Sequence, residues 1–144
     1  MSTSRKRPAL ERFHHLAIRM LRELRAVDEA AGLSGPRASA LSVLVFRGPQ
    51  SLGELADAEG VKPPTMSRLV KAMQVEGLVE SATVEHDQRR VRIAATPKGR
   101  ALMMKGRECR LEALARLFED ATPREVEALG RVADLMERSL VPRA

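Results

Sequence analysis

The sequence has 144 residues and a net charge of +6, from 25 Lys and Arg against 19 Asp and Glu. This is a one-domain length with enough chain to bury a core, and the basic excess suits nucleic acid or an anionic membrane surface. Aromatic residues make up 2%, with no Trp or Tyr, which argues against stacked rings for single-stranded nucleic acid. The single cysteine, Cys109, excludes an intrachain disulfide. No signal peptide or membrane-spanning run is visible, so we expect a cytoplasmic protein with no membrane partner.

The first quarter of the chain is predicted to form two helices. Residues 8–31 carry apolar side chains at helical spacing from Phe13 to Val27, and Gly32 closes this helix. Pro36 starts a second helix, residues 36–46, which ends before Gly48 and Pro49. Its inward face is predicted to hold Ala40, Leu41, Leu44 and Val45.

Two helices joined at a glycine follow. Ser51 caps a short helix over residues 52–59, with Glu54 at the capping-box position. Gly60 breaks this helix, and another runs over residues 62–76 until Gly77. This order is typical of a helix-turn-helix.

A β-hairpin and two long helices complete the chain. Residues 78–84 and 90–95 are short, partly alternating and rich in Val, Thr and Ile, around a polar tip at 85–89. Thr96 then caps a helix over residues 97–119. Thr122 and Glu125 repeat the capping box before a last helix with an apolar stripe from Val126 to Leu140.

These elements predict a mainly α fold with a small β-hairpin wing. A winged helix-turn-helix lobe (residues 34–96) is flanked by a helical dimerisation lobe (residues 8–31 and 97–141), within one domain over residues 1–144. The terminal helices carry more apolar surface than so small a core can cover. We therefore expect them to pack together and against a second subunit, in a homodimer.

The helix over residues 62–76 is predicted to read DNA. At ~100° per residue, its apolar side chains cluster on one side and short hydroxyls and long cations fall on the other. Such a face suits the major groove, with cations and hydroxyls on phosphates, Arg on a guanine edge and a methyl group against thymine. The candidate contacts are Lys62, Pro64, Thr65, Ser67, Arg68 and Lys71.

The wing adds a second set of candidate contacts, namely Arg89, Arg90 and Arg92. A thin ribbon with arginines at its end suits the minor groove, whose negative potential attracts them. Side chains alternate along a strand, so Arg90 and Arg92 share one face, which either meets solvent or contacts phosphate.

The order and spacing of several segments resemble those of the MarR (multiple antibiotic resistance regulator) family over nearly the whole chain. The segments are Leu52-Gly53-Glu54-Leu55-Ala56, Pro64-Thr65-Met66-Ser67-Arg68-Leu69-Val70-Lys71, Glu76-Gly77-Leu78-Val79-Glu80 and Ala95-Thr96-Pro97-Lys98-Gly99. The resemblance implies a homodimer that binds a near-palindromic duplex and represses transcription until a small-molecule ligand or oxidation releases it. It maps the family's recognition-helix contacts onto Pro64, Thr65, Ser67, Arg68 and Lys71, and its wing-tip arginine onto Arg89, with Arg90 as a substitute.

Other functions fit the sequence less well. No catalytic motif is visible, so we expect no enzyme and no cofactor. His14, His15 and His86 form no metal-ligand motif, so no metal is expected. Cys109, beside Arg107 and Arg110, is either inert or a reactive thiolate. The remaining alternatives are a winged-helix protein-interaction module and a non-specific architectural DNA binder.

Overall fold

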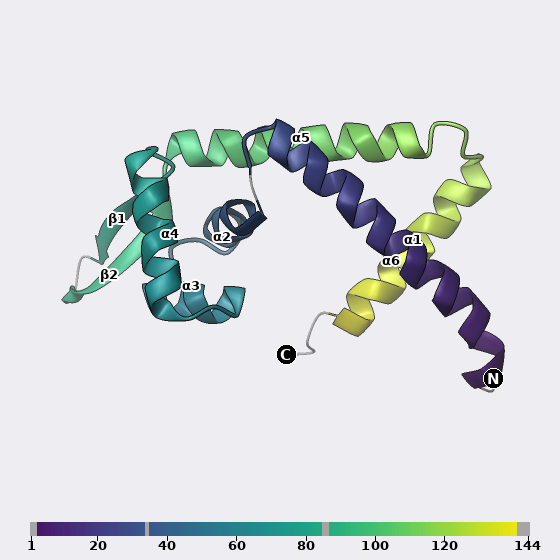
Figure 1. The fold of residues 1–144 in the computed structure, drawn as a ribbon, viewed down its shortest axis with the longest axis horizontal. Coiled ribbons are helices and arrows are strands. Elements are labelled where there is room, and N and C mark those ends of the chain that lie inside the picture. Colours follow the sequence, from purple (N-terminus) through teal and green to yellow (C-terminus); the bar gives the residue numbers. More distant parts are fainter. Residues whose placement is uncertain (1–2, 34, 85–86, 141–144) are drawn as a thin grey trace. The chain divides into compact units, whose positions relative to one another are not determined.

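The computed structural model describes residues 3–33, 35–84 and 87–140, and the side chains of residues 6–33, 35–82 and 91–140. Within these ranges the chain forms six helices and one two-stranded antiparallel sheet (Figure 1). It divides into two units, Met1–Ala113 and Leu114–Ala144. No helix among the described residues is both long and apolar enough to cross a membrane.

The first unit begins with the long helix α1 (Thr3–Ala30), which starts five residues before the predicted position. Pro8, the first residue of the predicted range, lies inside α1. Gly32 takes a positive φ of 82° after α1, as predicted for a helix stop. The side chain of Leu33 is then fully buried in the core.

Helices α2 (Gly35–Phe46), α3 (Leu52–Glu59) and α4 (Pro63–Val75) build the helix-turn-helix lobe. The predicted capping box of α3 is confirmed: Ser51 Oγ accepts the Glu54 N–H at 3.1 Å, and Glu54 Oε2 accepts the Ser51 N–H at 2.8 Å. Gly60 ends α3 in the left-handed conformation (φ 63°), which favours glycine. The core of the lobe includes all four predicted inward residues of α2, together with Leu55, Ala56, Met66, Val70 and Met73.

Strands β1 (Val79–Val84) and β2 (Asp87–Ala95) form the wing. Their register pairs Val79 with Ala95 and Ser81 with Ile93, and it shifts between Thr83 and Val84. The second strand begins three residues earlier than predicted, so Arg89 lies in β2 and not in a loop. Gln50, in the loop before α3, pairs with Ile93 through two backbone hydrogen bonds of 3.0 and 2.7 Å. The wing is thereby attached to the helix-turn-helix.

Helix α5 (Pro97–Leu117) begins at the predicted cap, where Thr96 Oγ1 accepts the Gly99 N–H at 3.1 Å. Its first part packs on the lobe so closely that a Cβ on Gly99 would clash with the Leu78 carbonyl oxygen. Farther along α5, Arg110 forms a 2.6 Å ion pair with Asp28 of α1. These contacts hold α1 and residues 97–113 of α5 within the first unit.

The second unit contains α6 (Pro123–Leu140), whose predicted capping box is also confirmed. Glu125 Oε2 accepts the Thr122 N–H at 2.8 Å, and Thr122 Oγ1 accepts the Glu125 N–H at 3.4 Å. None of the residues of α6 is buried.

Candidate nucleic-acid interface

Helix α4 has one buried and one exposed side, as the sequence predicts. Met66, Val70 and Met73 are buried and Leu69 is half-buried against the core. On the opposite side Ser67 is half-buried, and the remaining candidate contacts, Lys62, Pro64, Thr65, Arg68 and Lys71, are exposed. We call these six residues the α4 basic face.

The α4 basic face has a positive charge that no carboxylate offsets. Residues 60–75 contain no Asp or Glu. Among the described residues, Lys62, Arg68 and Lys71 have no side-chain hydrogen bond or ion pair. Arg37, Arg92 and Arg110 differ, because each bonds to a carboxylate in the same lobe or in α1. The cations of α4 are therefore available to phosphate without breaking an existing contact.

The first turn of α4 has no free backbone N–H groups for an anion. Helix N-termini usually present four free N–H groups that can bind a phosphate. Here Pro63 and Pro64 have no N–H, and the N–H groups of Thr65 and Met66 both donate to the Lys62 carbonyl oxygen, at 3.0 and 3.2 Å. No backbone N–H of residues 63–66 is therefore free to bind a phosphate.

The C-terminus of α4 is bonded to three neighbouring parts of the lobe, namely α2, the start of α5 and β1. Glu76, its C-cap, forms an ion pair with Arg37 of α2, and its carbonyl oxygen accepts a hydrogen bond from Lys98 Nζ at 2.8 Å. The hydroxyl of Thr96 donates to the Gly77 carbonyl oxygen at 2.6 Å, and Gln74 Nε2 donates to Ser81 Oγ of β1 at 3.1 Å. One end of α4 is thus fixed to the lobe while the α4 basic face remains open.

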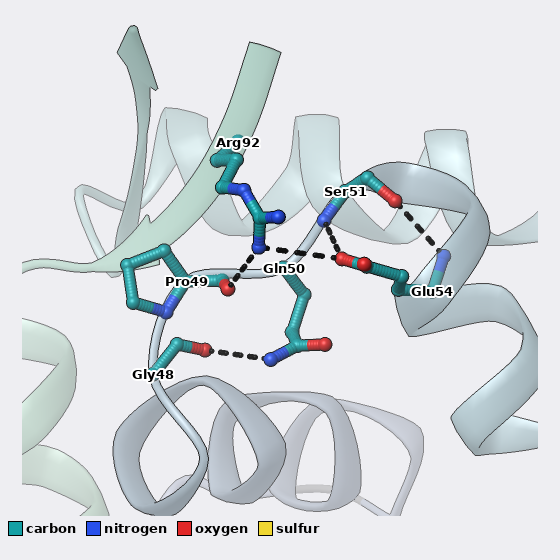
Figure 2. Close-up of polar contacts among 6 residues, drawn as sticks. All are labelled: Gly48, Pro49, Gln50, Ser51, Glu54 and Arg92. Carbon is teal, nitrogen blue, oxygen red and sulfur yellow. Dashed lines mark hydrogen bonds and ion pairs between the residues drawn. The ribbon is translucent and has the colours of Figure 1, made fainter. Parts of the chain in front are cut away.

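In the wing, only Arg92 has a described side chain among the three candidate arginines. Its Nη1 donates to the Pro49 carbonyl oxygen at 3.0 Å and lies 3.5 Å from Glu54 Oε2 (Figure 2). The sequence indicated either solvent or phosphate on this face and missed both partners, which lie 43 and 38 residues away along the chain. The side chains of Arg89 and Arg90 lie outside the described residues.

The sequence was compared with protein-family models and with known proteins. A model of the MarR family matches residues 31–90. An uncharacterized HTH-type transcriptional regulator from Mycobacterium bovis is 32% identical over 119 residues, which cover 83% of each chain. The chain belongs to the MarR family of transcriptional regulators. It is therefore a DNA-binding regulator, in a family whose members are not enzymes.

Two further proteins extend the likeness. The HTH-type transcriptional repressor IacR of Pseudomonas putida is 27% identical over 121 residues, which are 84% of this chain and 70% of the relative. A MarR family protein from Bacillus stearothermophilus has the same fold, with a TM-score of 0.86 over 99% of this chain and 100% of that one, at 24% identity. The predicted winged helix-turn-helix with long flanking helices is confirmed.

Other candidate chemistry in this MarR-family chain is sparse. No cluster of three or more His, Cys, Asp and Glu suited to a metal occurs in the described part of the chain. Cys109 is half-buried on α5. The two arginines near it in the sequence both form ion pairs, Arg107 with Glu108 and Arg110 with Asp28.

Proposed function

We propose that this MarR-family protein reads a near-palindromic DNA duplex as a homodimer, with α4 of each subunit in a major groove. The observation that carries the proposal is the α4 basic face, which contains no acidic residue and whose three cations, Lys62, Arg68 and Lys71, are exposed and have no side-chain partner among the described residues. Arg68 is proposed to bond to a guanine edge, and Lys62 and Lys71 to phosphates.

The wing is proposed to enter the adjacent minor groove through Arg89 or Arg90. The support is their place in β2, at the end of the hairpin, together with the affinity of arginine for the negative potential of that groove.

Dimer formation is proposed to use the apolar sides of the terminal helices. In α1, Phe13, Leu16 and Leu21 are about half exposed, at 48%, 49% and 53%. In α6, Val126, Leu129 and Val132 are similarly exposed. Rows of exposed apolar side chains along a helix are typical of surfaces that another subunit covers.

The regulatory role is proposed to be repression, released by a small-molecule ligand. Repression is supported by the likeness to the P. putida repressor. Release by a ligand is supported by the sequence resemblance to the family.

Selection from a randomised duplex pool, at two salt concentrations, tests the proposed function. The protein is first unfolded, dialysed and refolded to remove small molecules that copurify with it. We expect a near-palindromic sequence, with an affinity that falls steeply as salt rises because several phosphates are neutralised. Salt-sensitive binding without a selected sequence would favour an architectural binder instead. Failure to bind any duplex would favour the protein-interaction module.

A further inference from the structure

Arg92 connects the wing to the start of α3 (Figure 2). Its guanidinium belongs to β2, whereas Pro49 lies in the loop between α2 and α3 and Glu54 lies in the first turn of α3. The shorter of the two contacts, 3.0 Å to the Pro49 carbonyl oxygen, is a charge-assisted hydrogen bond. The 3.5 Å contact with Glu54 is a weaker ion pair between partly exposed groups.

One carboxylate oxygen, Glu54 Oε2, interacts with both α3 and β2. Glu54 Oε2 accepts the Ser51 N–H in the capping box of α3 and also faces Arg92. Next to this contact, Gln50 and Ile93 exchange two backbone hydrogen bonds. This bridge joins β2 to the loop before α3 at one residue, while β2 is also paired with β1 and Ile93 is buried in the core. The arginine contact, on the residue beside the bridge, adds a further attachment of β2 to this loop and to α3.

A phosphate is a poor alternative partner for this guanidinium. An anion bound to Arg92 Nη1 would approach the Glu54 carboxylate, which lies 3.5 Å from the same nitrogen. The two negative charges would repel each other.

We propose that Arg92 is a positioning residue, which locks β2 to the start of α3 so that the wing and α4 meet the duplex in one fixed relation. This inference rests on the proposed function and changes the role predicted for Arg92 from its sequence. A wing fixed in advance loses less conformational freedom when its arginines bind DNA, and this raises the affinity.

The first test measures backbone amide hydrogen exchange in the full-length protein without DNA. Arg92→Ala is expected to speed exchange of the Gln50 and Ile93 amides by at least about fivefold, with the amides of α2 unchanged. The control is Arg100→Ala, which removes an exposed cation from α5 and leaves these amides unchanged. Unaltered exchange at Gln50 and Ile93 would overturn the proposal, as would a general rise that includes α2.

The second test measures affinity for the selected duplex in two backgrounds. Arg92→Ala is expected to weaken binding about tenfold in the wild-type background, because the wing is no longer held in place. In an Arg89→Ala/Arg90→Ala background the same change should cost less than about twofold, because the wing contacts are already lost. An equal loss in both backgrounds would show a direct phosphate contact and overturn the proposal. If the wild-type protein binds no duplex, the proposed function fails, and the exchange measurement still decides whether Arg92 locks the strand.

Discussion

At the scale of single residues, the α4 basic face followed from the sequence and the contacts of the arginines did not. Helical periodicity places Met66 and Arg68 on different sides of α4 because both lie on one regular element. Arg92 bonds to Pro49 and Glu54, which lie far away along the chain, and no local sequence pattern predicts such a contact. For the same reason the ion pair of Arg37 with Glu76, which anchors α4, was not predicted.

Gly99 offers a residue-scale test of how α5 packs. A Cβ at Gly99 would overlap the Leu78 carbonyl oxygen, a backbone atom just before β1 that cannot rotate away as a side chain can. Gly99→Ala is therefore expected to lower the free energy of unfolding by about 1–3 kcal/mol or more, measured by urea denaturation.

Gly106→Ala is the matched control on the same helix. Its new Cβ would meet a terminal methyl group of Leu33, which can rotate away more readily than a carbonyl can move. We expect a smaller loss than for Gly99→Ala. Equal losses, or the reverse order, would contradict the close approach of α5 to Leu78.

At the scale of elements, the sequence predicted the starts of α3, α5 and α6 from their side-chain caps and missed the start of α1. The boxes of Ser51 with Glu54 and of Thr122 with Glu125 place α3 and α6 correctly, because both partners lie within four residues. For α1 the sequence predicted a start at residue 8, and the structure places the start at Thr3. The wing was predicted too short because its charged end has no glycine or asparagine to mark the turn.

The cap of α6 gives a pH-dependent prediction. Hydrogen bonds from the backbone N–H and the hydroxyl of Thr122 lower the pKa of Glu125 below its ordinary value of 4.5. A lowered pKa in the folded state means that the ionised cap stabilises the helix start above the ordinary pKa, and that this contribution is lost as the pH falls through the lowered value.

The measurement is an NMR titration of the Thr122 amide proton. Its shift should titrate with a midpoint below pH 4.5. Glu125→Gln should abolish this titration while keeping the cap, since glutamine also accepts a hydrogen bond in a capping box. A midpoint at or above 4.5 in the wild-type protein would contradict the cap.

At the scale of the whole molecule, the terminal helices are the part of the chain that we propose forms the dimer. Their apolar stripes were visible in the sequence because a stripe depends only on spacing. The sequence does not show what covers them, because that depends on surfaces brought together by folding or by association. The proposed homodimer would bury both stripes.

Substitution in α6 tests the dimer. The double change Leu129→Gln/Val132→Gln is expected to raise the dimer dissociation constant about 100-fold, measured by sedimentation equilibrium, because apolar burial is lost in both subunits. Glu127→Gln, at an exposed polar position of the same helix, is the control and should leave the constant unchanged. A wild-type monomer at micromolar concentration, or a double variant that dimerises normally, would refute this role of α6.

The central claim is that α4 reads base sequence through Arg68, and the most direct test compares Arg68→Ala with the wild type on two duplexes. Fluorescence anisotropy would give the affinity for the selected near-palindrome and for an unrelated sequence, at one salt concentration. Arg68→Ala should weaken binding to the selected duplex by about 1–3 kcal/mol and binding to the unrelated duplex much less, because a base contact exists only on the correct sequence. Equal losses on both duplexes would show that Arg68 binds phosphate alone and would contradict the claim.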